Sequence, residues 1–277
     1  YTWTDVGNVL LGLGLTLDTV TGVISGTPTA LTAHDFAATF LVTDSGGRTA
    51  SGPVTLRIRP RTDRASVNIA GSSIAGSSSA QPSISGTSGQ FIVFSSNASN
   101  LVAGMSGNQV YVHNRRTGQP SLVSRDNDNS SINQGTGASS TPSISDNGRF
   151  VAFVSQSTNL LSPAVPAMVA GQVYVRDTQM GLTSLVSQDN SGGLVPGNGP
   201  SSTPSISGDG RFVVFVSSST NLVAGGVAGT QVYVRDTQTG LTSLVSQDNS
   251  GGLVEGNGVS STPSISDNGR FVAFVSQ

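Results

Sequence analysis

The amino-acid sequence predicts an all-β protein built from repeated four-stranded antiparallel sheets. Its composition disfavours helices, because all 13 basic residues are arginines and Glu255 is the only glutamate, so two of the best surface helix formers are nearly missing. Val, Thr, Ile and Phe, which fit a pleated sheet, recur throughout. The other two observations are a repeat of about sixty residues and, inside each copy, four short strand-like runs separated by turn residues.

The repeat is marked by a Pro-Ser-Ile-Ser phrase that begins at Pro82, Pro142, Pro204 and Pro263. Residues 139–156 recur without a change at 260–277. Residues 173–195 recur at 232–254, where only Met180 is replaced, by Thr239. Self-similarity at a fixed period indicates the duplication of one structural unit.

Each unit contains four predicted strands. In the second unit, the Pro-Ser-Ile-Ser strand is followed by an Asp146-Asn147-Gly148 turn, whose residue types accept positive φ. The later strands are predicted at residues 149–155, 172–177 and 182–187. Four antiparallel strands per repeat are typical of a propeller blade.

The unit resembles the TolB-like, WD40-like propeller blade, whose pattern is P-x-x-S-x-D-G-[RK]-x-[VI]-[AV]-F followed by a [VI]-Y-[VL]-x-D strand. The residues of the second unit that fill this pattern are Pro142, Ser145, Asn147-Gly148-Arg149, Ala152-Phe153, Val173-Tyr174-Val175 and Asp177. The resemblance implies part of a β-propeller. The first unit departs from the pattern, with Gly-Thr-Ser-Gly-Gln at 86–90 and His113-Asn114 in place of Arg-Asp, so we expect the first blade to be the least regular.

Residues 1–59 contain no copy of the repeat. Residues 14–18, 21–28 and 42–45 resemble the hallmarks of the putative-Ig (He_PIG-type, cadherin-like) domain of bacterial surface proteins. This resemblance implies an immunoglobulin-like β-sandwich, incomplete at its N-terminus. We therefore expect that domain at 1–59, an Arg/Pro-rich linker at 60–65, and about three and a half TolB-like blades, incomplete at the C-terminus, at 66–277.

Both ends of the chain indicate a longer protein. Tyr1 opens in strand-like sequence without the basic and apolar regions of a signal peptide, so we expect the native N-terminus upstream. The last repeat stops after its second strand. Because ring closure is what removes exposed sheet edges, we expect either part of a larger ring or an open stack with an unpaired edge.

Charge and composition narrow the partners. A net charge of −2 with 10% charged residues gives no basic field for nucleic acid. The absence of Cys excludes disulfides, thiolate metal sites and a cysteine nucleophile. No apolar run reaches the length of about 18 residues that a transmembrane helix needs.

The most site-like sequence is the loop that joins the fourth strand of one unit to the first strand of the next. Its side-chain oxygens could ligate Ca²⁺, but the spacing is not that of an EF-hand, and Asx-turns explain the same residues. We therefore expect no resident metal or cofactor. The binding candidates in these loops are Asp126, Asp128, Asp189, Asn190, Asp248 and Asn249.

The loops after the second strands, with Asn159 and Asn221, should emerge at the same end of the blade as the loops of Asp189 and Asp248. That shared face is the predicted binding surface, because loops on a rigid scaffold usually carry recognition. Its polar, Asn-rich lining would suit a carbohydrate or a protein.

We expect no catalytic residues. The two histidines, His34 in a predicted loop and His113 on a third strand, lack a nucleophile-elbow context and are interpreted as surface residues. Arg149, Arg211 and Arg270 recur beside the same turn, so we expect them to cover strand edges or to pair with the Asp of a neighbouring turn.

The leading hypothesis is a non-catalytic, exported binding or scaffold protein, extracellular or at the cell surface, whose propeller loops recognise a glycan or a protein. Its location outside the cytoplasm is implied by the family resemblance, and the periplasm is the alternative. Two other functions remain open: an accessory propeller of a larger secreted hydrolase, and a structural repeat of a surface layer or filament.

Overall fold

A computed structural model describes residues 1–28, 34–58, 64–68, 70, 77–86, 88–128, 133–161, 171–248 and 254–277. The chain forms two compact units, residues 1–64 and 65–277. Most of the predicted linker, residues 60–63, lies outside the described residues.

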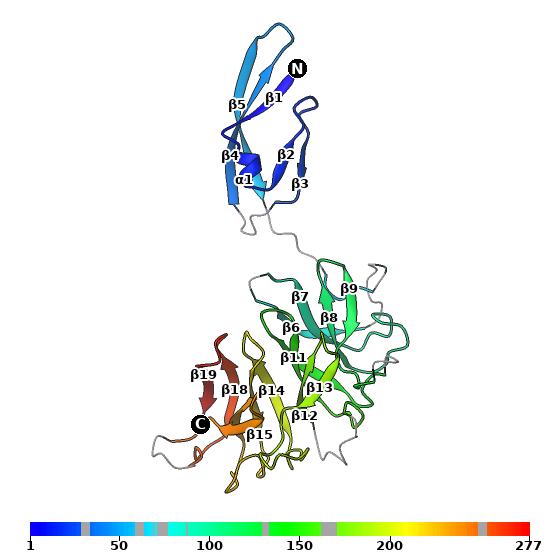
Figure 1. The fold of residues 1–277 in the computed structure, drawn as a ribbon, viewed down its shortest axis with the longest axis vertical. Coiled ribbons are helices and arrows are strands. Elements are labelled where there is room, and N and C mark those ends of the chain that lie inside the picture. The colour runs from blue at the N-terminus through cyan, green and yellow to red at the C-terminus, as the bar shows by residue number, and fades with distance from the viewer. Residues whose placement is uncertain are drawn as a thin grey trace. The chain divides into compact units, whose positions relative to one another are not determined.

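The first unit contains an antiparallel sheet in the order β1-β4-β5 and a separate β2-β3 hairpin (Figure 1). Its elements are β1 (Thr2–Val6), α1 (Val9–Gly12), β2 (Leu15–Leu17), β3 (Ile24–Gly26), β4 (His34–Thr43) and β5 (Thr49–Ile58). Leu10 of the short helix packs with Ala38 and Phe40 of β4. His34 begins β4, so its predicted placement in a loop is wrong: the strand starts earlier than its apolar residues indicate.

The second unit is a series of antiparallel sheets, which we call blades 1 to 4 (Figure 1). Blade 1 is β6 (Ser79–Ile84), β7 (Phe91–Ser96), β8 (Gln109–Asn114) and β9 (Gln119–Leu122). Blade 2 is β10 (Ser139–Ile144), β11 (Phe150–Ser155), β12 (Gln172–Asp177) and β13 (Leu182–Leu185). Blade 3 is β14 (Ser201–Ile206), β15 (Phe212–Ser217), β16 (Gln231–Asp236) and β17 (Leu241–Leu244). Blade 4 is the pair β18 (Ser260–Ile265) and β19 (Val272–Ser276).

The predicted strands are confirmed, except that the first strands begin earlier and the fourth strand of blade 2 ends at Leu185, two residues before its predicted end. The first strand of blade 2 begins at Ser139, three residues before the predicted start at Pro142. A bulge between Ser140 and Ser143 lets the strand continue past Thr141, which takes a φ of 47° directly before the proline. Such a bulge is one of the few places where a strand can hold an internal proline.

Neighbouring blades share their cores. One cluster joins Val93, Val110 and Val123 of blade 1 to residues of blade 2 such as Phe153, which stacks on Tyr174 with ring centroids 5.9 Å apart. A second cluster joins blades 2 and 3 in the same way. Each sheet therefore buries its apolar face against the next copy, which is where most of the hydrophobic stabilisation of this unit arises.

The turn after the first strand of a blade packs closely against the preceding blade. Gly148 and Gly210 have φ of 73° and 81°, and a Cβ on either would overlap the ring of Phe91 or Phe150. Asp146 N–H also donates to the Gly208 carbonyl across the blade boundary, at 2.9 Å. Only glycine satisfies both the backbone conformation and the contact distance.

Blade 1 keeps the strand order and pairing of the later blades: Phe91 pairs with Asn114 where Phe150 pairs with Asp177. The expectation that it would be the least regular blade is therefore wrong for its strands, since the additional turn residue is accommodated between Ile84 and Ile92. The residues of blade 1 that differ from the repeat therefore change its side chains and leave the strand pairing of the sheet the same.

Candidate functional site

The predicted loop residues bridge parts of the scaffold. Asn190 donates through Nδ2 to the Thr242 carbonyl at 2.8 Å and accepts from Thr242 N–H at 2.7 Å, so its amide joins blade 2 to the last strand of blade 3. Asn127, at the same position one repeat earlier, joins blade 1 to Thr183 of blade 2 in the same manner. These amides copy the pairing of a β-ladder across the blade boundary.

The aspartates of these loops form local turns. Asp189 accepts hydrogen bonds from the backbone and the hydroxyl of Ser191, at 3.1 and 2.7 Å. Asp126 accepts from Asp128 N–H and from Asn133. Asp248 N–H donates to the Val254 carbonyl, and Asn249 lies outside the described residues. The geometry of Asp189 and Asp126 is that of Asx-turns.

Asn159 and Asn221 contact the loops that precede the first strands of their own blades. Asn159 accepts from Thr136 N–H at 2.9 Å and donates to the Gln134 carbonyl at 3.0 Å, and Asn221 repeats this with Asn198 and Pro196. The structure thus brings the two predicted kinds of loop together. Both ends of each amide are bonded to backbone, which fixes the loops.

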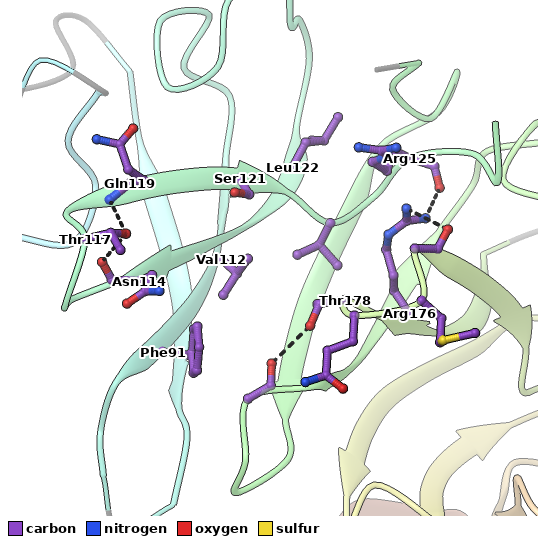
Figure 2. Close-up of a pocket in the computed structure, with 15 residues that line it drawn as sticks. Phe91, Val112, Asn114, Thr117, Gln119, Ser121, Leu122, Arg125, Arg176 and Thr178 are labelled. Atoms are coloured by element: carbon purple, nitrogen blue, oxygen red, sulfur yellow. Dashed lines mark hydrogen bonds between the residues drawn. The ribbon is translucent and has the colours of Figure 1, made fainter. Parts of the chain in front are cut away.

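A groove of about 510 Å³ lies between blades 1 and 2, and none of the eight predicted residues lines it. We call it groove 1. Figure 2 shows Asn114, Thr117 and Gln119 at one end, Arg125 and Arg176 at the other, and Phe91 and Val112 between them. Met180 and Gln179 of the turn after β12 also line groove 1. Its volume falls within the range of about 300–1,000 Å³ that is usual for small-molecule sites.

Arg176 is buried at the inner wall of groove 1, with 3% of its surface exposed. Its Nη1 donates to the carbonyls of Arg125 and Asp126, both at 3.1 Å, and to the Thr183 hydroxyl at 2.7 Å. Its Nη2 donates to the Gly181 carbonyl (Figure 2). The guanidinium therefore links two blades. Its hydrogen-bond acceptors are uncharged carbonyl and hydroxyl oxygens, so burying the positive charge is costly unless every donor is bonded.

Arg125 adds a second positive charge at this end of groove 1. Burial, together with repulsion from Arg125, lowers the pKa of Arg176 to about 10, against the opposing effect of Asp126 and Asp177. Arg176 remains charged at neutral pH. Both charged residues of the lining are arginines, and the carboxylates of Asp126 and Asp177 lie close enough to Arg176 to offset part of this charge.

The other end of groove 1 is neutral and amide-rich. Asn114 accepts a hydrogen bond from Gln90 at 3.3 Å. In blades 2 and 3 the corresponding pair is ionic: Arg149 Nη2 lies 2.6 Å from Asp177, and Arg211 Nη2 lies 2.6 Å from Asp236. The predicted pairing of these arginines with a neighbouring aspartate is thus confirmed, and the hydrogen bond from Arg211 lowers the pKa of Asp236.

A second groove of about 390 Å³ occupies the equivalent place between blades 2 and 3, and we call it groove 2. It contains Phe150, Val175 and Arg235 where groove 1 has Phe91, Val112 and Arg176. Four polar positions of groove 1 differ: Asn114, Thr117, Gln119 and Arg125 correspond to Asp177, Met180, Leu182 and Gln188 in groove 2. Groove 2 therefore has one arginine and one carboxylate in its lining.

His113 occupies the position of Arg176 and Arg235 in blade 1, and it is buried, with 6% of its surface exposed. Its interpretation as a surface histidine is wrong, because the face that carries it also carries the buried Phe94 and Tyr111. Burial, and then Arg115, lower the pKa of His113. Within the described ranges, Nδ1 of His113 has no hydrogen-bond partner.

The described part of the chain was also searched for metal-ligand clusters and for membrane-spanning helices. No group of three or more His, Asp or Glu residues there is arranged to hold a metal ion. No helix there has the length and apolar character needed to cross a membrane.

The fold and the grooves define an all-β repeat protein of propeller-like blades. Residues 1–59 match the family model "Putative Ig domain". A comparison with curated protein sequences gives no match.

Solved β-propeller structures are similar to the chain at low identity. "Putative TolB from Agrobacterium tumefaciens" is 13% identical with a TM-score of 0.40, over 84% of this chain and 73% of that one. The Dos1 propeller is 16% identical with a TM-score of 0.33, over 86% and 53%. A puromycin-hydrolyzing peptidase of Mycobacterium tuberculosis is 14% identical with a TM-score of 0.36, over 96% of this chain but only 36% of the peptidase.

Sequence reasoning missed Arg125, Gln119 and Arg176 as residues that line a groove. The signal was present in the first unit, whose departures from the repeat were read as irregularity. The loop that begins Arg125-Asp126-Asn127 corresponds to Gln188-Asp189-Asn190 in the next unit, so a comparison between repeats isolates Arg125.

Proposed function

We propose that this chain is a non-catalytic, exported binding protein in which rigid propeller blades present a surface to a glycan or protein ligand. Residues 1–59 act as an immunoglobulin-like β-sandwich spacer. The observation that carries the proposal is groove 1, where exposed amides and hydroxyls surround an apolar floor without a paired acid and base. Export is supported by the match of residues 1–59 to a domain family found in bacterial surface proteins and, to a smaller extent, by the Lys-free, Gly/Ser/Thr-rich sequence.

The non-catalytic part rests on the chemistry of the described side chains. His113 is buried on the face away from groove 1, and groove 1 is lined by neutral and cationic groups. A hydrolase needs a nucleophile or a polarised water together with a general base, and the lining residues of groove 1 offer no side chain that acts as a base at neutral pH.

The test is a binding screen of the purified chain against glycan and surface-protein arrays, with a panel of peptide and glycoside substrates assayed alongside. The proposal predicts saturable binding and no turnover. The matched variant is Gly148→Ala, which should loosen the packing between blades 1 and 2 and weaken binding without changing a polar side chain of groove 1. Turnover of any substrate, or the absence of every ligand, would contradict it.

A further inference from the structure

We infer that groove 1 binds a neutral glycan, with a sugar ring over the Phe91–Val112 floor and its hydroxyls on Gln119, Ser121 and Gln179. This inference rests on the proposed binding function and assigns its ligand class and its contact residues. Three observations carry it: the charged side chains of the lining already have partners, the sheet edges beside the groove are blocked, and the remaining polar groups are neutral and exposed.

The first observation disfavours a charged ligand. Groove 1 is lined by two arginines and no carboxylate. Arg176 donates through Nη1 and Nη2 to carbonyl and hydroxyl oxygens, and Asp126 and Asp177 offset part of its charge. Arg125 also has an interaction partner within the protein. An anion would have to compete with these partners, and a cation would meet two positive charges. Both arginines therefore serve as the wall at one end of groove 1 (Figure 2).

The second observation disfavours an extended peptide. Thr183 of β13 directs its backbone N–H and carbonyl away from β12, and the Asn127 side-chain amide bonds both, at 2.6 and 3.0 Å. The equivalent residue of β9 is Pro120, which has no N–H to donate. Extended peptides usually bind by adding a strand to a free sheet edge, and at either of these edges an added strand would lose ladder hydrogen bonds. A ligand of groove 1 must therefore be bound by side chains.

The third observation selects a sugar. Gln119 and Ser121 lie on β9, and Gln179 lies in the turn after β12. All three are exposed, and within the part of the chain that the structure describes their side chains form no hydrogen bonds. Amides and hydroxyls of this kind exchange hydrogen bonds with sugar hydroxyls in both directions. Phe91 and Val112, both half-buried, provide an apolar floor for the C–H face of a sugar ring.

Groove 2 has the same strands without these groups. Leu182 stands at the position of Gln119, and Gln238, the equivalent of Gln179, does not line groove 2. The carboxylate in its lining, Asp177, is already paired with Arg149. Groove 2 should therefore bind a neutral glycan more weakly than groove 1, so we expect one site in the chain.

The experiment measures binding of the full chain to maltotetraose, cellotetraose, laminaritetraose and chitotetraose. Oligogalacturonate is the charged alternative, and an octapeptide of alternating Ser and Val is the strand-forming one. Gln119→Leu introduces the residue that the next repeat carries as Leu182, and Gln179→Ala shortens an exposed side chain, so both should fold. Gln238→Ala is the matched control, because Gln238 occupies the position of Gln179 in the next repeat and does not line groove 1. Circular dichroism and urea midpoints verify folding of each variant.

We expect at least one of the neutral tetrasaccharides to bind saturably. Gln119→Leu and Gln179→Ala should each weaken its binding by about threefold to tenfold, since each removes hydrogen bonds to the sugar. Gln238→Ala should bind as the original chain does. Affinity should stay the same as salt is raised from about 50 to about 500 mM, because no ligand charge is involved.

Two results would overturn the inference: unchanged binding by both groove variants, or binding of oligogalacturonate or the octapeptide that is at least as tight and is weakened by Gln119→Leu. The proposed function has its own outcome. If a glycan or a protein binds and neither groove variant has an effect, the binding function stands and the assignment of groove 1 fails. If nothing binds, both fail.

Discussion

Grooves 1 and 2 are built by the same strands in successive repeats, and they differ in the side chains that a ligand would meet. Both have a phenylalanine floor and a buried arginine that bonds to the carbonyls of the preceding loop, Arg125 and Asp126 in one case, Gln188 and Asp189 in the other. They diverge at four positions, where Asn114, Thr117, Gln119 and Arg125 of groove 1 correspond to Asp177, Met180, Leu182 and Gln188 of groove 2.

This comparison distinguishes residues that stabilise the scaffold from residues that could contact a ligand. A residue that recurs in successive blades, such as the turn glycine or the buried arginine, is explained by packing between copies. A residue that changes while its surroundings stay constant has no such explanation. In a repeat protein the neighbouring copy is therefore an internal control for function, available without any related sequence.

The largest effect should come from the turn glycines. Gly210→Ala places a side chain at a φ of 81° and onto the ring of Phe150, so the free energy of unfolding should fall by about 3 kcal/mol. Gly89→Ala in blade 1 places its Cβ 3.3 Å from Ile84 Cδ1 and 3.5 Å from Arg115 Nη1, both at the ends of side chains that can move, and should cost about 1 kcal/mol, mainly from backbone strain. Urea unfolding measures both. Equal losses would mean that the contact between blades is unimportant.

A smaller loss should follow from removing a buried arginine. Arg235→Leu removes the donor of the Asp189 carbonyl and of the Thr242 hydroxyl, and leaves the Gln188 carbonyl with the Thr242 hydroxyl alone, which should cost about 1–3 kcal/mol. The matched variant is His113→Leu, at the same position in blade 1, where Nδ1 has no partner among the described residues, and it should be neutral or stabilising. A larger loss for His113→Leu, measured by thermal and urea unfolding, would reverse the comparison.

The smallest effect is a pH dependence confined to blade 1. Burial holds the pKa of His113 below its usual value of about 6.5, with Arg115 acting in the same direction. As pH falls below about 6.5, the unfolded chain binds a proton that the folded chain does not, so the free energy of unfolding should decrease until the folded pKa is reached. His113→Gln should remove this slope between about pH 7 and pH 5. Carboxylates such as Asp236, whose pKa is lowered, titrate below this window.

Much of the fold was predictable from the sequence because the repeated phrases recur at a nearly constant spacing. The third strands, such as Gln172–Asp177, were placed at their observed bounds because alternation and turn residues agree there. The first strands were placed too late, since a bulge at Thr141 places a proline inside a strand and no local pattern reveals that.

The site was less predictable. Asp189 and Asn190 were chosen as binding residues because clustered Asp and Asn on a loop are typical both of ligand contacts and of turns. In the structure Asp189 forms an Asx-turn with Ser191, and Asn190 pairs with Thr242 of the next blade. Such a contact between residues 52 positions apart depends on how two blades stack, which residue type alone does not encode. Whether these loops also bind a ligand stays a prediction.

The most direct test of the central claim converts groove 2 into groove 1. The triple variant Asp177→Asn, Leu182→Gln and Gln188→Arg copies three of the four differing positions into the neighbouring repeat. The fourth, Met180, is kept because it also lines groove 1. Calorimetry with a groove 1 ligand that the binding screen identifies should show the stoichiometry rise from one site to two. The double variant that changes Asp177 and Leu182 but keeps Gln188 should show one site again. An unchanged stoichiometry in a folded triple variant would contradict the claim that these three positions determine recognition.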